Sequence, residues 1–422
     1  MGADTALALL AVAGGAAVLF GWARYRTLLN PLSVVAVLDT GVTTTLSGVL
    51  AFVLLPLARY DEGDMVRTVT VSGVHLAGTV LPYCFSGPLP GRLFGAAMRL
   101  VGLGRDELAR RWQPLKFALL LAGAVLSFGA LAVSGGGGMR WLSDPRTAYL
   151  FNRTGAGQFW LLSQWLLMTA LLYYLWSVRP RGIRMVAAAA IFVASAYFTG
   201  SKAVILSVLV MCMAYYNFLV RPLPAVAFVL AGLTVPAMFV ALLFIQGSFR
   251  TAAEVATYFE HFDVTTQFLS RFDEFGLQYG GAWLSTLWFY VPRALFPDKP
   301  LEYGYNLLQK RLYPGAFEAG YAPGFLTWSL DYLDFGVVGV FLAGVYRGLL
   351  QRAAYEHFLQ HRDNMFAFLM MMQVSLWAVL SFMTPGAAVV WSLAHALLLR
   401  LVLYRRTAAP AAAPAPAEGV RA

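Results

Sequence analysis

The chain has 422 residues, of which 59% are apolar and only 12% are charged, and its formal net charge is +10. An ordinary soluble domain carries about 25% charged residues, and a soluble core of this length could not bury so much apolar surface without exposing large patches. The composition therefore excludes a soluble protein. The positive charge suits contact with anionic lipid head groups, so nucleic acid is not an expected partner.

Apolar segments follow one another along most of the chain. A window of about 19 residues finds eleven of them, each near the roughly 20 residues that a helix needs to cross the hydrocarbon. They lie near 5–22, 33–58, 69–89, 115–134, 157–177, 185–199, 203–220, 223–246, 325–347, 364–383 and 386–404. Two pairs are nearly continuous, so counts of ten to twelve stay open. The sequence predicts an all-α polytopic membrane protein with a single transmembrane domain, 1–406, and a disordered cytoplasmic tail, 407–422.

Positive charge predicts how the chain is oriented in the membrane. One alternating set of loops holds most of the Lys and Arg, at 24–26, 92–116, 179–184, 221, 347–362 and 405–406. Because cytoplasmic loops carry the excess of basic residues, this set is predicted to be cytoplasmic. The N-terminus and the segment 248–324 are then outside, and the C-terminus is inside.

The segment 248–324, between the eighth and ninth predicted spans, is the most polar part of the chain. Ordering so long a loop has an entropic cost that a functional site would justify. Its first part, 251–276, repeats apolar residues at helical spacing and predicts an amphipathic helix on the outer membrane surface. This helix ends in Arg271-Phe272-Asp273-Glu274, a set that suits anion binding and base catalysis as well as a solvated helix end.

A second candidate lies at 290–304, where three prolines stiffen the backbone around Arg293 and Lys299. Aromatic rings beside polar groups suit sugar binding, since sugar C–H faces stack on them. The predicted sugar-binding residues are Trp288, Tyr290, Tyr303 and Tyr305. An interfacial aromatic belt is the competing interpretation, although a belt would not need so many paired charges.

A third candidate is the turn Thr199-Gly200-Ser201-Lys202 between the sixth and seventh spans. Its lysine and the backbone N–H groups at a helix start suit phosphate, with Gly and Ser allowing close approach of a ligand. A snorkelling lysine at a hairpin tip is the alternative.

Ionisable residues within the spans are few. Asp39 and His75 are exceptions in the second and third spans, and Asp331 and Asp334 lie within or just above the ninth. Carboxylates at membrane depth are costly and favour a functional interpretation, although capping of a helix end near Gly336 is an equal alternative for Asp334. No cluster has convincing metal-ligand spacing, so a metal-independent protein is expected.

The motifs resemble those of a known family, the oligosaccharide repeat-unit polymerases of bacterial envelopes (the Wzy or O-antigen polymerase group). The likeness lies in the Gly-Ser-Lys turn, in Pro292-Arg293 followed by 297–300, and in 322–325 leading to 334–339, over roughly residues 195–345. The turn in this family usually reads Gly-Ser-Arg. Lys202 here gives up a bidentate contact with phosphate.

The resemblance implies a GT-C-like fold and glycosyl transfer at the outer face of the bacterial cytoplasmic (inner) membrane. The donor would be a glycan on polyprenyl (undecaprenyl) pyrophosphate, and the acceptor another lipid-linked repeat unit of O-antigen, capsule or exopolysaccharide. Basic residues would bind the pyrophosphate and stabilise its charge as it leaves: Lys202, Arg271, Arg293, Lys299 and Arg250. A chain-length regulator and a flippase would be its protein partners. No cofactor is expected.

The acceptor hydroxyl would need a positioned general base. The candidates are Asp273, Glu274, Glu302, His261 and Asp331, and the sequence does not choose among them. A ligase that transfers finished glycan from the same donor is the nearer rival. A transporter is more distant, because that class places charges within several spans to line a path.

The external arginine provides a direct test. Arg293→Ala is expected to abolish chain lengthening, because a cation would no longer stabilise the leaving pyrophosphate, while the protein still folds in the membrane. The measurement is a glycan size profile on a gel, and normal long-chain glycan would remove Arg293 from the mechanism.

Overall fold

The computed structural model describes residues 2–54, 61–85, 87, 89–100, 112–152, 156–224, 226–228, 230, 241, 260–291, 296–300, 302–318, 324–377, 392–398 and 400. These residues form helices and connecting turns, with no strand among them. Six helical segments of this part are long and apolar enough to cross a membrane: Ala3–Tyr25, Pro31–Leu50, Pro114–Ser134, Gly157–Val178, Lys202–Val220 and Ser329–Gln360. The protein is therefore an all-α membrane protein, as predicted.

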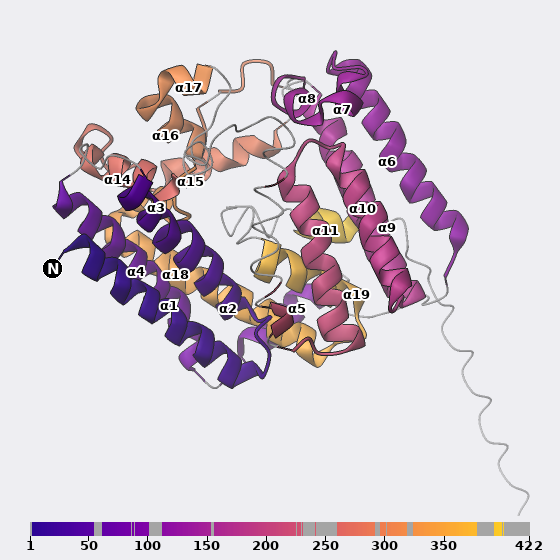
Figure 1. Ribbon diagram of the computed structural model, residues 1–422, viewed down its shortest axis with the longest axis horizontal. Helices are drawn as coiled ribbons and strands as arrows, with labels where there is room; N and C mark the ends of the chain where they lie inside the picture. The colour runs from indigo at the N-terminus through magenta and orange to yellow at the C-terminus, as the bar shows by residue number, and fades with distance from the viewer. Residues whose placement is uncertain are drawn as a thin grey trace, which may run out of the picture.

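One group of helices packs around the long helix α18, Ser329–Gln360 (Figure 1). Its other members are α1 (Ala3–Tyr25), α2 (Pro31–Val35), the π-helix η1 (Ala36–Leu46), α3 (Ser47–Leu54), α4 (Glu62–Cys84) and α5 (Leu89–Leu100). α1 packs on η1 and α4, and α4 packs on α18 along much of its length.

A second group lies beside the first, on the right of Figure 1. It contains α6 (Pro114–Ser134), α7 (Arg140–Ser143), α8 (Pro145–Phe151), α9 (Gly157–Val178), α10 (Ile183–Tyr197), α11 (Lys202–Tyr215), the π-helix η2 (Tyr216–Val220), α19 (Met365–Met370) and the π-helix η5 (Met371–Trp377). η5 contacts α2, α11 and α18, so it joins the two groups.

Short helices cover one end of the first group, at the upper left of Figure 1. They are α14 (His261–Ser270), the 3-10 helices η3 (Phe272–Glu274) and η4 (Thr286–Tyr290), α15 (Gly281–Ser285), α16 (Tyr305–Leu312) and α17 (Pro314–Glu318). α14 buries its apolar side against α3 and α4. The amphipathic helix predicted at 251–276 therefore begins, in the described part, at His261, and it packs on other helices and not on a lipid surface. Residues 251–259 lie outside the described residues.

The predicted spans agree with the structure at α1, α6, α9 and α11 within a few residues. Those at 185–199 and 364–383 appear as shorter apolar helices, Ile183–Tyr197 and Met365–Ser375. The spans at 223–246 and 386–404 and the tail 407–422 lie largely outside the described residues, so the count of eleven and the GT-C-like fold stay predictions.

The ninth span was predicted to end at Arg347, with Arg347 and Arg352 in a cytoplasmic loop. In the structure α18 continues to Gln360, so both arginines lie inside a helix and not in a loop. The side of the membrane on which they lie stays a prediction. The helix turns sharply at Gly336, whose φ of 63° and ψ of −152° are far from helical values and are open to glycine. The part of α18 before Gly336 therefore has a different axis direction from the part after it.

Glycines allow α4 and α18 to lie in direct backbone contact. A Cβ atom on Gly344 would lie 2.7 Å from the carbonyl oxygen of His75, and one on Gly348 would lie 2.4 Å from that of Thr79. On the other helix, a Cβ on Gly78 would lie 2.5 Å from the carbonyl oxygen of Phe341. Small residues at such a crossing let membrane helices approach closely.

Gly344→Leu is expected to separate α4 from α18 and to lower the free energy of unfolding by at least about 2 kcal/mol, because a side chain there meets backbone that cannot move aside. Thermal unfolding in nanodiscs is the measurement. The matched control is Gly129→Leu, at an exposed position of α6 where a Cβ meets nothing within 4 Å. Equal stability of the two variants would contradict a tight crossing.

Candidate functional site

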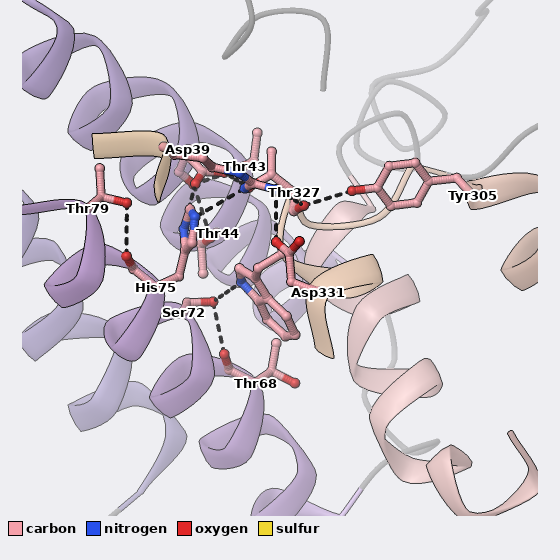
Figure 2. Close-up of polar contacts among 12 residues, drawn as sticks. Asp39, Thr43, Thr44, Thr68, Ser72, His75, Thr79, Tyr305, Thr327 and Asp331 are labelled. Carbon is pink, nitrogen blue, oxygen red and sulfur yellow. Dashed lines mark hydrogen bonds and ion pairs between the residues drawn. The ribbon is translucent and has the colours of Figure 1, made fainter. Parts of the chain in front are cut away.

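Polar side chains converge where η1, α4 and the start of α18 meet beneath the short helices (Figure 2). Asp39 comes from η1, His75 from α4, and Asp331 and Arg347 from α18. Asp39, His75 and Asp331 are each less than 10% exposed, and the Arg347 side chain is 11% exposed. We call these four residues the buried charge network.

Asp39 and His75 form the first half of this network. Oδ2 of Asp39 lies 3.1 Å from Nδ1 of His75, and its Oδ1 accepts a hydrogen bond of 2.9 Å from the Thr327 hydroxyl. Nε2 of His75 lies 3.1 Å from Nη1 of Arg347. Because a guanidinium only donates, Nε2 is the acceptor there and Nδ1 carries the proton towards Asp39. The contacts therefore fix a neutral imidazole in one tautomer.

Arg347 and Asp331 form the second half. Nη2 of Arg347 lies 2.8 Å from Oδ2 of Asp331 and also donates to the carbonyl oxygen of Thr327 at 3.1 Å. The other oxygen, Oδ1 of Asp331, accepts from the indole of Trp283 at 2.7 Å. Two carboxylates thus face one guanidinium, so the network carries one net negative charge while His75 is neutral.

The elements place these residues by helical periodicity. Thr68, Ser72, His75 and Thr79 are spaced three or four residues apart, so they form one polar face on α4. The Ser72 hydroxyl accepts from the indole of Trp328 at 3.0 Å. This spacing is visible in the sequence and indicates a polar seam inside an apolar span.

His261 lies beside the network, at the first residue of α14. A Cβ on Gly324 would lie 2.1 Å from the imidazole, so only glycine lets the loop before α18 pass so close to this ring. Burial lowers the pKa of His261, whereas its hydrogen bond with the Gly324 backbone and the carboxylate of Asp39 oppose that effect. The lowered pKa keeps His261 neutral at pH 7.

The other predicted carboxylates lie away from this network. Glu274 forms two hydrogen bonds with Arg271, at 2.8 and 2.6 Å, and Asp273 is exposed beside it. Glu302 is exposed and pairs with Lys310. Hydrogen bonding to the Arg271 guanidinium lowers the pKa of Glu274. These surface groups fit the solvated ion pairs that were the alternative interpretation.

Asp334 caps a helix, but this helix is α15 and not one that ends near Gly336. Its two oxygens accept from the backbone N–H groups of Ala282 and Trp283, at 2.9 and 2.8 Å, at the start of α15. Asp334 thus ties α15 to α18, and the same tie sets Trp283 against Asp331.

The predicted substrate-binding residues are spread over several places. The Lys299 ammonium donates to the carbonyl oxygen of Val291 at 3.1 Å and lies 4.8 Å from the centre of the Tyr303 ring. Tyr305 donates to the carbonyl oxygen of Thr327 at 2.8 Å, which brings it to the network, while Trp288 contacts Phe296. Arg250, Arg293 and the side chain of Tyr290 lie outside the described residues.

Lys202 is in the second group of helices, buried at the start of α11. The preceding glycine was expected to let a ligand approach. In the structure that space is filled by the protein, because a Cβ on Gly200 would lie 2.1 Å from the carbonyl oxygen of Pro145 in α8. The turn is held further by the indole of Trp160, which donates to the carbonyl oxygen of Thr199 at 3.0 Å.

Sequence reasoning missed Arg347 as a site residue, having placed it in a cytoplasmic loop, and noted Asp39 and His75 without assigning them a role. Across the part of the chain that the structure describes, no cluster of three or more His, Cys, Asp or Glu side chains has the geometry to hold a metal ion.

The chain is similar to two curated proteins, both described as O-antigen polymerase, from Salmonella typhimurium strain LT2 and from Salmonella typhi. Each is 24% identical over 218 residues, which cover 50% of this chain and 53% of the relative. The chain thus spans about half the length of the curated relatives it matches. No family model matches it, and no solved structure does. The similarity supports a distant relationship to the family that the motifs resemble.

Arg347→Met is expected to lower the free energy of unfolding by about 3–5 kcal/mol, because it leaves Asp331 buried without a cation. The double variant Arg347→Met/Asp331→Leu is expected to regain part of that loss. Denaturant unfolding of purified protein measures both, with the exposed Arg181→Met as the matched control. An Arg347→Met protein as stable as this control would contradict the ion pair.

Proposed function

We propose that the protein is a glycosyltransferase that polymerises polyprenyl-pyrophosphate-linked oligosaccharide repeat units at the outer face of the bacterial cytoplasmic membrane. The observation that carries the proposal is the buried charge network, set at the junction of membrane helices and a cap of short helices rich in aromatic residues. The distant similarity to O-antigen polymerases supports the choice of reaction.

The reaction needs a base on one side and cations on the other. The acceptor hydroxyl oxygen forms a bond with the anomeric carbon of the donor, the bond from that carbon to the pyrophosphate oxygen breaks, and the pyrophosphate leaves with the electron pair. The hydroxyl proton goes to the base. Because a lipid pyrophosphate is already a good leaving group, no cofactor is required for this balance.

His261 is the base that the geometry favours among the five candidates. Glu274 and Glu302 are exposed and tied to cations, Asp273 is exposed, and both oxygens of Asp331 are occupied by Arg347 and Trp283. His261 is neutral and close to the Asp39 carboxylate, which favours the imidazolium that proton transfer would create. Asp39 and His75 would position the imidazole of His261 and stabilise the positive charge that it gains.

The buried charge network itself is unsuited to pyrophosphate, because its two carboxylates outnumber its one guanidinium. The anion would instead meet the basic residues of the cap. Lys299 holds its ammonium over the ring of Tyr303, a place where a cation and a sugar-stacking face adjoin. Arg293, Arg250 and Arg271 remain proposed partners of the pyrophosphate, whereas Lys202 lies in the second group of helices and not in the cap.

The proposed setting is the bacterial inner membrane, with the N-terminus outside, the C-terminus in the cytoplasm and the cap of short helices outside. The lipid-linked donor and acceptor would enter from the bilayer, and a flippase and a chain-length regulator would be partners.

His261→Asn is expected to slow chain lengthening at least about 100-fold, since a general base contributes that much or more. The measurement is the size profile of lipid-linked and surface glycan in a deletion strain that carries the variant. The control is His361→Asn, an exposed histidine at the end of α18. Single repeat units are expected to accumulate with the deletion and with His261→Asn only.

Three results would count against parts of this proposal. Normal long chains with His261→Asn would remove His261 as the base. Long chains that stay on the lipid carrier in the deletion strain would favour the ligase. Unchanged glycan in the deletion strain would overturn glycosyl transfer as the function.

A further inference from the structure

A second polar site lies in the other group of helices, away from the buried charge network. It is a partly open cavity of about 60 Å³ between α9, α11 and η5, closed on one side by His395. Figure 1 shows α9 and α11 on the side of the molecule opposite α1 and α4. None of the residues that line this cavity has a role in the proposed glycosyl transfer.

Hydrogen bonds fix the orientation of the polar groups at its wall. The Thr169 hydroxyl donates to the carbonyl oxygen of Trp165 at 2.6 Å, so its oxygen is the acceptor for Nε2 of His395, 2.7 Å away. With its proton on Nε2, His395 accepts at Nδ1 from the amide nitrogen of Gln373. The opposite tautomer would point an N–H of His395 at the amide N–H of Gln373, two donors facing each other.

This chain of bonds leaves two polar atoms unused at the cavity. The amide oxygen of Gln373 and the amide nitrogen of Gln164 are buried and have no hydrogen-bond partner in the described structure. Both residues line the cavity, and each is only 8% exposed. An unpaired buried polar atom destabilises the structure around it, so the pair favours an occupant that donates to Gln373 and accepts from Gln164. A hydroxyl group is the smallest group that does both.

The remaining wall indicates what carries that hydroxyl. No lining residue is ionised, and Met168, Met211 and Met372 with Val204 and Val210 present apolar, adaptable surface. Such a wall excludes a phosphate or ammonium head group, whose desolvation nothing here would offset. The cavity has room for about four water molecules, but water would leave most of this apolar surface poorly covered.

We propose that this cavity binds the hydroxyl end of a neutral lipid, a long-chain alcohol whose head lies between Gln164 and Gln373 and whose chain leaves through the open side towards the bilayer. The amides select one group that donates and accepts, and the methionines and valines cover the first carbons of the chain. This is a lipid site separate from the one that a charged pyrophosphate lipid would occupy.

The test uses the full chain in nanodiscs with a photoreactive hexadecanol that carries an alkyne. Labelled peptides are identified by mass spectrometry, and unlabelled hexadecanol, its methyl ether and hexadecyl phosphate are compared as competitors. Label is expected on α9, α11 or η5, and the methyl ether, which cannot donate, is expected to compete about tenfold less well. The phosphate is expected not to compete.

Variants locate the site. Gln164→Leu and Gln373→Leu are each expected to reduce labelling about tenfold, whereas Gln158→Leu, an exposed glutamine on the first turn of α9, is expected to leave it unchanged. A second measurement on the wild type needs no variant: hexadecanol is expected to raise the unfolding temperature and its methyl ether is not. Three outcomes would each show that the cavity holds water only and would overturn the proposal. They are equal competition by the alcohol and the ether, label spread over the lipid-facing helices, and no shift in unfolding temperature.

Discussion

The close crossing of α4 and α18 is the constraint on which the candidate site depends. Only glycines at 78, 344 and 348 let the two backbones touch, and this contact sets His75 of one helix opposite Arg347 of the other. Arg347 then reaches Asp331, 16 residues earlier in its own helix, past the turn at Gly336. Helix contact, sharp turn and ion pair therefore form one arrangement, and a change in any of them would disturb the others.

Burying charge inside membrane helices is costly, and the structure limits that cost by giving each carboxylate oxygen of the network a partner. Asp39 bonds to His75 and Thr327, and Asp331 bonds to Arg347 and Trp283. Thr327 takes part in both halves, through its hydroxyl and through its carbonyl oxygen, so the loop before α18 is tied to the membrane helices at one residue. A network of this kind persists because no smaller part of it would be stable alone.

Apolar length alone predicted much of the fold. The helices α1, α6, α9 and α11 begin and end near the predicted limits because nearly every side chain in them is apolar. The prediction failed where polar residues lie inside a helix. α4 begins at Glu62 instead of near residue 69, and α18 continues past Arg347, since Arg67 bonds to Tyr332 and Arg347 to Asp331. Hydropathy treats such residues as exposed to lipid, and a single sequence does not show that Arg67 has a partner 265 residues away, or that Arg347 has one across the turn in its own helix.

Two of the sites described here lie on π-helical segments, since Asp39 is in η1 and Gln373 is in η5. A π-helical turn holds one residue more than an α-helical turn, which shifts the face that the following residues present by about 100°. Asp39 lies in the first turn of η1, so the shift acts on the residues after it, among them Thr43 and Thr44, whose hydroxyls both donate to the carbonyl oxygen of Asp39. A chain with one residue fewer in η1 would form a plain α-helix here, and the residues after Asp39 would turn by about 100° relative to the polar seam of α4.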